Sequence, residues 1–380
     1  MHIKKNKINN GENMDIFNIY LPIAEIQFNV ILLFVLGFCV GVLGGFFGVG
    51  GGWIVTPTLN IFGFPMDYAI GTDITYIFGT SIVSTKIHSG LGNIDWKLGI
   101  FSIVSSVIGV EVGAQFIMYL GKTYGTEGLD SIVRWSFITL LIFLGSFMLY
   151  DYFVVQKRLS EEERKADDPK QTHISRIQKK KKTALPIRLQ SIRLFPMVSF
   201  KTSGIKSVSF WIVFVIFFIA GVLQGFLGVG GGFIKMPAMI YLLGVPTVIA
   251  VGTDLFNVLI TSIYGGFTYA IKGRVELIAA VIMFFGGALG AIFGSTATKY
   301  VRGYGIRLLF AIMIIVAGGS VVIKQLEKPL GMPIFNDISG YVVVGAAMLM
   351  TSVVLWKLIS SYYKLKKSEI GFDPDSIGKH

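Results

Sequence analysis

The stretch "GVLGGFFGVGGGWIVTP" occupies residues 41–57, and a near copy, "GVLQGFLGVGGGFIKMP", occupies residues 221–237. Both copies place three consecutive glycines inside an apolar neighbourhood. Glycine is the least favourable ordinary residue in a helix interior, by about 1 kcal/mol relative to alanine. Two copies of such an unfavourable helix sequence indicate that the peptide backbone itself has a role at these positions, where longer side chains would cover it.

Long apolar blocks surround both copies. Of the 380 residues, 53% are hydrophobic and 15% are charged, whereas soluble domains carry about 25% charged residues. A helix needs roughly 20 apolar residues to cross the hydrocarbon of a bilayer. Blocks of that length lie at 131–153, 209–230, 304–323 and 340–362, with less pure ones at 71–90, 97–120, 252–271 and 276–297. The sequence therefore predicts an all-α polytopic membrane protein.

The similarity between the two glycine runs continues along both halves of the chain. "GFPMDYAIGTD" (63–73) matches "GVPTVIAVGTD" (244–254), and "GNID" (92–95) parallels "GRVE" (273–276). Further pairs are the two "TSI" triplets, Gly113-Ala114 with Gly290-Ala291, and Arg134 with Arg307. Each half therefore has a glycine-broken apolar segment followed by three transmembrane helices, and one extra C-terminal helix follows the second half.

This pattern divides the chain into five parts. They are an N-terminal membrane repeat (1–155), a basic cytoplasmic loop (156–208), a C-terminal membrane repeat (209–325), an additional transmembrane helix (326–362) and a polar tail (363–380). If residues 28–62 cross the membrane once, the halves are parallel; if they form a re-entrant hairpin, the halves are inverted. The charges of the second half favour the inverted arrangement, although it places Lys4, Lys5 and Lys7 outside.

The formal net charge is +12, and residues 156–208 hold 14 Lys and Arg against 5 Asp and Glu. Basic loops are typical of the cytoplasmic side, where anionic lipid headgroups attract them. We therefore expect the run at 179–182 to meet lipid headgroups and not nucleic acid. A second copy of the chain, as a homodimer, remains open as a partner.

The triple glycines are the candidate substrate site. Unwound backbone inside a membrane is tolerated only against protein or a wet cavity, and a helix that restarts there presents free N–H groups that suit an anion. The residues concerned are Gly50, Gly51, Gly52, Gly230, Gly231 and Gly232. The alternative role of such glycines, close helix packing, fits better the spaced pairs Gly41/Gly45 and Gly221/Gly225.

Other classes of site fit poorly. Neither copy has the Lys-Ser/Thr that ends a phosphate-binding loop, and a dinucleotide fingerprint would need a third glycine where Trp53 and Phe233 stand. An enzyme would need a nucleophile with a base or a metal cluster, yet four histidines and one cysteine show no clustered spacing. We expect no cofactor, no metal and no enzymatic activity.

Polar residues in the same segments extend the candidate site. Lys235 replaces Val55 in the second copy and would either bind the anion or snorkel to an interface. Thr80, Ser81, Thr261, Ser262 and Asn257 would either donate hydrogen bonds to the substrate or join helices to each other.

Three carboxylates are candidates for proton coupling. Asp73 and Asp254 follow Gly-Thr in both halves, where the alternative is that Thr or Asp caps a helix. Glu111 lies in the middle of a span, with Ala288 opposite it in the repeat. An ionisable group inside a span costs about 2.5–3.5 kcal/mol and is by default a functional candidate.

The paired Gly-Val-Gly-Gly-Gly…Pro segments, each followed by Gly-x-Pro and then Gly-Thr-Asp, resemble the sulfite exporter TauE/SafE family. The resemblance implies a bacterial or archaeal inner-membrane permease for small sulfur-containing anions such as sulfite or organosulfonates. By position, it assigns the contacts with the anion to the two glycine triplets. The loop at 156–208 and the last span look like extensions of the family pattern.

Internal repeats and interrupted helices are typical of secondary transporters, and we expect this function, with or without a link to protons. A passive anion channel on the same glycine elements is the alternative. A sensory role of the basic loop is a further hypothesis.

Overall fold

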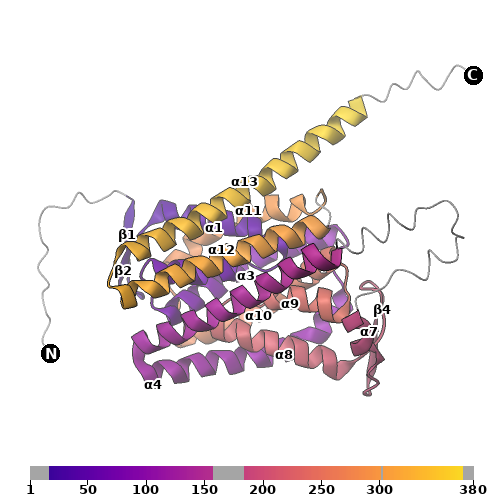
Figure 1. The fold of residues 1–380 in the computed structure, drawn as a ribbon, viewed down its shortest axis with the longest axis horizontal. Coiled ribbons are helices and arrows are strands. Elements are labelled where there is room, and N and C mark those ends of the chain that lie inside the picture. The colour runs from indigo at the N-terminus through magenta and orange to yellow at the C-terminus, as the bar shows by residue number, and fades with distance from the viewer. Residues whose placement is uncertain (1–16, 157–183, 301–302, 371–380) are drawn as a thin grey trace, which may run out of the picture.

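The computed structural model describes residues 17–156, 184–300 and 303–370. The described chain forms a bundle of helices that run along one common direction, with a strand hairpin at each end (Figure 1). The basic run at 179–182, Lys4, Lys5, Lys7, the end of the polar tail and the side chain of Arg307 lie outside what is described.

The first half begins with the hairpin β1 (Asn18–Leu21) and β2 (Ile26–Asn29). Its helices are α1 (Val30–Phe47), α2 (Gly52–Ile61), α3 (Met66–Gly90) and α4 (Trp96–Tyr150), and a π-helical turn (Asp151–Gln156) ends it. Helix α4 is broken at Gly125, whose φ of 68° and ψ of −179° are not helical. The two parts of α4 therefore correspond to two of the predicted spans.

The second half repeats this order after a short helix, α7 (Ala184–Ser191). Its elements are β3 (Met197–Phe200), β4 (Ile205–Ser209), α8 (Phe210–Leu227), α9 (Gly232–Ala238), the π-helix η2 (Met239–Leu243), α10 (Thr247–Ile271), α11 (Leu277–Ala297) and α12 (Gly303–Leu330). Helix α13 (Ile334–Ile370) follows, and its last turns project beyond the bundle (Figure 1). The similarity of the halves thus includes the two hairpins.

The prediction of an all-α polytopic membrane protein is confirmed. In the described part of the chain, seven helices are long and apolar enough to cross a membrane, and the 58-residue one that contains α4 is long enough for two crossings. Helix α3, with 25 residues, is more polar, and most of its residues are buried. More than half of α3 therefore packs against other parts of the bundle.

The segment from α1 to α2 is a re-entrant hairpin. The ring of Phe28, before α1, lies 5.9 Å from that of Phe62 and 5.7 Å from that of Phe64, both after α2. Gly51, at the start of α2, lies against the side chain of Val40, two turns before the end of α1. The chain therefore turns back at the glycines and returns to the end where it entered.

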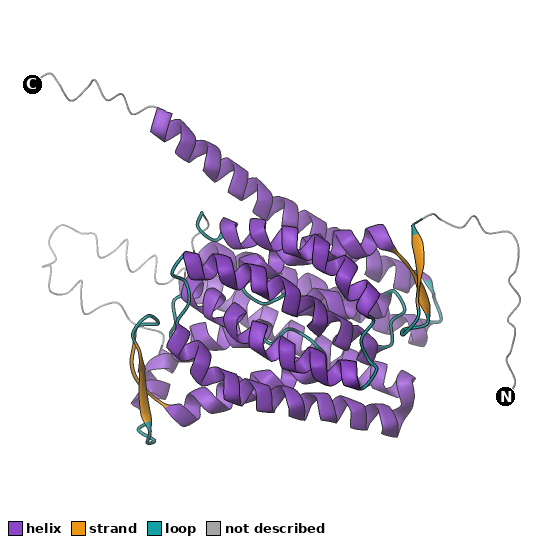
Figure 2. Ribbon diagram, turned by 180° about the vertical axis from the view of Figure 1, so that it is seen from behind, coloured by secondary structure: helices purple, strands orange, loops and turns teal. Residues whose placement is uncertain are grey.

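The two halves run in opposite directions. We call the end that carries β1–β2 end A and the end that carries β3–β4 end B; Figure 2 shows the hairpins at opposite ends of the bundle. In the second re-entrant segment, the carbonyl of Leu243 accepts a hydrogen bond from Gln190 Nε2 of α7, at end B, where α8 begins. Each half therefore enters and leaves its re-entrant segment at its own end.

Close glycine contacts interlock the halves. Helix α1 packs on α11, where a Cβ on Gly41 would overlap the carbonyl of Gly287; helix α8 packs on α4, where a Cβ on Gly221 would overlap that of Ser106. Such approach of backbones is the known use of small residues in membrane helices. The packing role of Gly41 and Gly221 is thus observed directly.

These contacts also correct one pairing made from the sequence. A Cβ on Gly290 would meet the backbone of Phe38 and Val42, and one on Gly109 would meet that of Phe218 and Val222. Gly290 is therefore the counterpart of Gly109, not of Gly113, and Glu111 does not correspond to Ala288. The glycines recur every four residues here, so the sequence allowed a shift by one helical turn.

Each hairpin is held by a carboxylate of the opposite half. Glu276 Oε2 accepts hydrogen bonds from the backbone N–H groups of Ile23 (2.7 Å) and Ala24 (3.1 Å) at the β1–β2 turn. Asp95 Oδ2 accepts from the backbone N–H (2.9 Å) and hydroxyl (2.6 Å) of Ser203 at the β3–β4 turn. At each end of the bundle, these hydrogen bonds therefore join one half of the chain to the other.

We expect Gly290→Ala to lower stability by about 1–3 kcal/mol, because the added methyl group overlaps the α1 backbone. The matched control is Gly345→Ala in α13, where nothing lies within 4 Å of the added atom; better helix propensity should raise stability there by up to about 1 kcal/mol. Thermal unfolding in detergent measures both. Equal effects of the two variants would contradict the packing described.

Candidate functional site

Both glycine runs break their helices. Gly48, Gly50 and Gly51 have φ angles of 80°, 73° and 94°, and Gly228, Gly230 and Gly231 have φ angles of 72°, 71° and 70°. Left-handed backbone of this kind is easily adopted only by glycine. The backbone conformation therefore explains why glycine stands at these six positions.

The two broken segments lie against each other. A Cβ on Gly52 would overlap the carbonyl oxygen of Gly228, and one on Gly232 would lie 2.6 Å from Val49 Cα. Beside them, Trp53 and Phe233 stack at 6.2 Å between ring centroids. The glycine runs of the two halves thus meet backbone to backbone inside the bundle, and we call them the paired glycine loops (residues 48–52 and 228–232).

The paired glycine loops present unused hydrogen-bond donors. Among the described residues, the backbone N–H groups of 50–53 and of 230–233 have no hydrogen-bond acceptor, whereas those of Ile54 and Ile234 bond to Gly51 and Gly231. The first N–H groups of a helix have no partner within it. Such groups with the helix dipole behind them can bind an anion.

A buried lysine lies beside the second loop. Lys235 is fully buried, so it does not snorkel, and its Nζ donates to Gln224 Oε1 (2.9 Å) and Asn257 Oδ1 (2.6 Å). Asn257 Nδ2 in turn donates to Ser102 Oγ of α4 (2.8 Å). Three helices of the second half and one of the first half therefore fix the position of this ammonium group.

The two repeated carboxylates also lie inside the bundle, and both are fully buried. Asp73 Oδ2 accepts a hydrogen bond from Thr56 Oγ1 (2.6 Å), and Asp254 lies against Gly232. Asp73 Oδ1 and both oxygens of Asp254 have no hydrogen-bond partner in the described structure. Buried carboxylates without a full set of donors are costly and call for an explanation.

The capping interpretation of the Gly-Thr-Asp triplets is wrong. Helices α3 and α10 begin at Met66 and Thr247, each directly after a proline, so the triplets lie in the second turn. Instead, each threonine hydroxyl binds a residue of the opposite half. Thr72 Oγ1 accepts a hydrogen bond from the N–H of Glu276, and Thr253 Oγ1 accepts one from the N–H of Asp95, both at 2.9 Å. The prolines occupy the N-cap positions, where their lack of an N–H group costs the helix no hydrogen bond and where they cannot continue a preceding helix.

The other hydroxyl candidates divide into two groups. Thr80 Oγ1 donates to the carbonyl of Ile77 (3.1 Å) and Thr261 Oγ1 to that of Asn257 (2.9 Å), within their own helices. Ser81 and Ser262 are fully buried, and their Oγ atoms have no partner in the described structure. Only the serines therefore have hydroxyl groups that are free for a ligand.

Glu111 lies apart from the glycine loops. It is partly exposed on α4 and accepts hydrogen bonds from Tyr264 (2.9 Å) and Thr268 (3.4 Å) of α10 and from Gln115 (2.5 Å). Its carboxylate thus links α4 to α10. The structure does not bring it to Asp73, Asp254 or Lys235.

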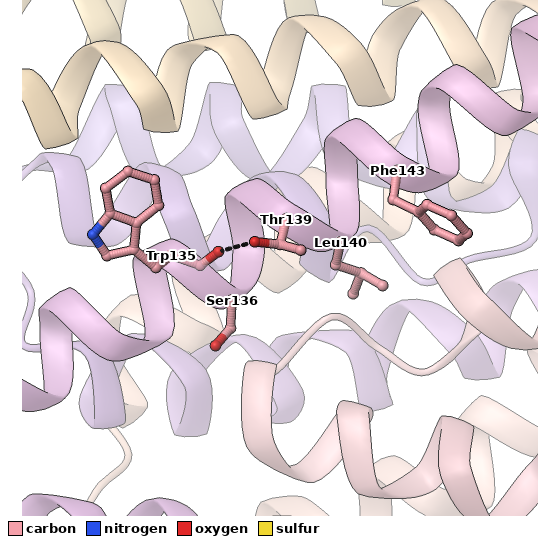
Figure 3. Close-up of a pocket in the computed structure, with 5 residues that line it drawn as sticks. All are labelled: Trp135, Ser136, Thr139, Leu140 and Phe143. Carbon is pink, nitrogen blue, oxygen red and sulfur yellow. Dashed lines mark hydrogen bonds between the residues drawn. The ribbon is translucent and has the colours of Figure 1, made fainter.

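A groove of about 400 Å³ lies elsewhere, on the outer face of α4, lined by Trp135, Ser136, Thr139, Leu140 and Phe143. Figure 3 shows these side chains on one helix, with the Thr139 hydroxyl bonded to the carbonyl of Trp135 (2.9 Å). Trp135 is 56% exposed and Phe143 is 69% exposed. Apolar side chains on this face suit contact with lipid, and no candidate site residue lines the groove.

Sequence reasoning did not identify Gln224, Thr56 or Ser102 as site residues. The sequence contained a signal for Gln224. It stands where the first copy has Gly44, and it is the one difference between "GVLGG" and "GVLQG". Thr56 and Ser102 carry no such signal, since ordinary threonines and serines abound in these helices. Only the folded chain shows their contacts with Asp73 and Asn257.

Comparison with known proteins finds similarity to membrane transporters. The family model described as "Sulfite exporter TauE/SafE" matches residues 33–321. The probable membrane transporter protein YunE of Bacillus subtilis is 25% identical over 300 residues, which cover 77% of this chain and 97% of the relative. A probable membrane transporter protein of Methanocaldococcus jannaschii is 39% identical over 106 residues, or 25% of this chain and 40% of the relative. No solved structure matches.

We expect Thr56→Val to lower stability by about 1–3 kcal/mol, because it removes the hydroxyl group that donates to the buried Asp73 Oδ2. The matched control is Thr58→Val, two residues along α2, whose buried hydroxyl bonds only to the carbonyl of Ile54 in its own helix. Thermal unfolding in detergent compares them. A loss no larger in Thr56→Val than in Thr58→Val would contradict this role.

Proposed function

The chain belongs to the sulfite exporter TauE/SafE family of membrane transporters, and from this premise we propose that it is a secondary transporter of small anions. The substrates proposed are sulfur-containing oxyanions such as sulfite or organosulfonates. The observation that carries the proposal is the contact between the paired glycine loops, whose free N–H groups lie beside the buried Lys235.

The arrangement of the halves supports a carrier mechanism. Inverted repeats allow one half to rock against the other around a site at their interface, so that the site opens to each side in turn. The contacts of Gly52 with Gly228 and of Gly232 with Val49 close the path at the loops in this conformation. A passive channel is the second candidate, but backbone contact at the centre of the path favours the carrier.

A link to protons is part of the proposal. Asp73 and Asp254 are the carboxylates at the loops, with three oxygens that lack donors in the described structure. A proton on one of them would remove a negative charge from the neighbourhood of the anion. Glu111, which lies elsewhere, is a weaker candidate for this role.

We place the protein in the cytoplasmic membrane, with end B inside. Helix α4 ends and α8 begins at end B, and the sequence between them holds most of the excess positive charge of the chain. Positively charged connections stay on the cytoplasmic side. Anionic headgroups at that surface are the proposed partners of the loop.

The test of the function is a flux assay in proteoliposomes with sulfite, sulfate, thiosulfate and chloride side by side. We expect saturable uptake of sulfite. When unlabelled sulfite is trapped inside, labelled sulfite should enter by counterflow, because a carrier exchanges one bound substrate for another across the membrane. Conductance without counterflow would instead establish the channel. Absence of flux for every anion would contradict the proposed function.

We expect Asp254→Asn to remove most of the pH dependence of sulfite uptake, because the amide cannot exchange a proton. The rate is measured between pH 5 and pH 8 after correction for the ionisation of sulfite itself. Asp337→Asn, an exposed residue in the first turn of α13, is the matched control. An unchanged pH profile in Asp254→Asn would contradict the proton link at this residue.

A further inference from the structure

The two repeats differ in polarity at three buried positions that meet at one point. The second half has Gln224, Lys235 and Asn257 where the first half has Gly44, Val55 and Tyr76. All three polar side chains are fully buried, and both amide oxygens bond to Lys235 Nζ. These three polar replacements of the second half therefore meet in one cluster, the Lys235 cluster (Ser102, Gln224, Lys235 and Asn257).

The donors of this cluster exceed its acceptors. Lysine has three N–H groups, and the described contacts of Lys235 Nζ use two of them, on Gln224 and Asn257. The amide nitrogen of Gln224, which carries two more, has no partner in the described structure. Buried donors of this kind are rare in native proteins and call for a ligand or water.

Lys235 Nζ and the amide group of Gln224 lie at the second glycine loop. A Cβ on Gly231 would overlap Gln224 Oε1 and would lie 2.7 Å from Lys235 Nζ. The backbone N–H groups of 230–233 also lack acceptors among the described residues. Side-chain and backbone donors therefore converge on one small region.

The first half has no charged side chain at the three equivalent positions, and its buried donor without a partner at the loop, in the described chain, is the neutral indole N–H of Trp53. Val55 has no donor, and Tyr76 uses its hydroxyl on the carbonyl of Gly37 (2.8 Å). A Cβ on Gly44 would lie 3.1 Å from the backbone of Gly50, so a side chain as long as glutamine would not fit without a rearrangement. The site that carries a positive charge is consequently single, although the loops are paired.

Charge balance limits what this site can hold. Asp254, against Gly232, is the carboxylate in electrostatic contact with Lys235, yet no ion pair within 4.0 Å involves Lys235 in the described chain. Asp73 is the second carboxylate near the loops, and Thr56 is its partner. With Asp73 and Asp254 both protonated, the one buried ammonium group compensates one negative charge on a bound anion, and a second uncompensated charge would be expensive at this depth.

We infer that each chain binds one monovalent oxyanion, held in the second half by Lys235 Nζ and Gln224 Nε2. Asn257 and Ser102 are positioning residues, because they act on the substrate only through Lys235. Two separate donors suit an anion with several oxygens on one atom, such as a sulfonate or hydrogen sulfite. The assignment rests on the anion transport proposed above and adds to it the location, the number and the charge of the bound anion.

The test uses methanesulfonate, sulfate and chloride as probes of the full-length protein in proteoliposomes. For the wild type, we expect the KM for methanesulfonate to be at least tenfold lower than that for sulfate. Gln224→Glu should raise the KM for methanesulfonate at least tenfold with a smaller change in maximal rate, because its carboxylate neutralises Lys235. Gln27→Glu, on the exposed face of β2, makes the same change away from the site and serves as its control.

A second set of variants uses the repeat itself as the control. Lys235→Met should abolish saturable uptake and Lys235→Arg should restore part of it, whereas Val55→Ala at the equivalent position of the first half should retain it. Thermal unfolding establishes that each variant is folded; if Lys235→Met does not fold, the KM of Gln224→Glu decides.

The outcomes distinguish the proposed single-anion site from the proposed anion transport. An unchanged KM in folded Gln224→Glu, or equal KM values for sulfate and methanesulfonate in the wild type, overturns the single-charge site and leaves anion transport standing. A wild type that moves none of these anions, nor sulfite, overturns both.

Discussion

The hydrogen-bonding needs of the peptide backbone decide how this molecule is arranged. Hydrocarbon offers no partner for a free N–H or carbonyl group, so a helix broken inside a membrane has to be covered by protein. Here each broken helix covers the other: Gly52 lies on Gly228, and Gly232 lies on Val49. Because the cover comes from the opposite half, neither half has a complete interior without its partner.

The interlocked packing follows from the same need. Helix α1 of the first half crosses α11 of the second, and α8 crosses α4, in both cases through glycines that permit contact between backbones. Without a hydrophobic force between helices in lipid, such contact is a principal source of association. The halves are therefore held together by the helices that flank the loops, while the loops themselves keep donors free.

The class of the fold and the repeat were predictable because apolar block length and self-similarity are properties of sequence alone. The starts of α3 and α10 were misread because Pro65 and Pro246, and not the later Thr and Asp, mark where these helices begin. The four-residue recurrence of glycine hid the pairing of Gly109 with Gly290. At the site, Lys235 was visible as a mismatch between copies, but its links to Gln224 and Ser102 depend on contacts between distant helices.

The ties between hairpins and opposite halves have a mechanical consequence. Glu276 and Asp95 are buried carboxylates that bind backbone amides of the other half, one at each end. Charge-assisted bonds of this type contribute about 1.5–3 kcal/mol each, so the separation of a hairpin from the opposite half carries at least that cost. Each hairpin is thus bonded to the half that it does not belong to, and the halves can separate at either end of the bundle only if these hydrogen bonds break.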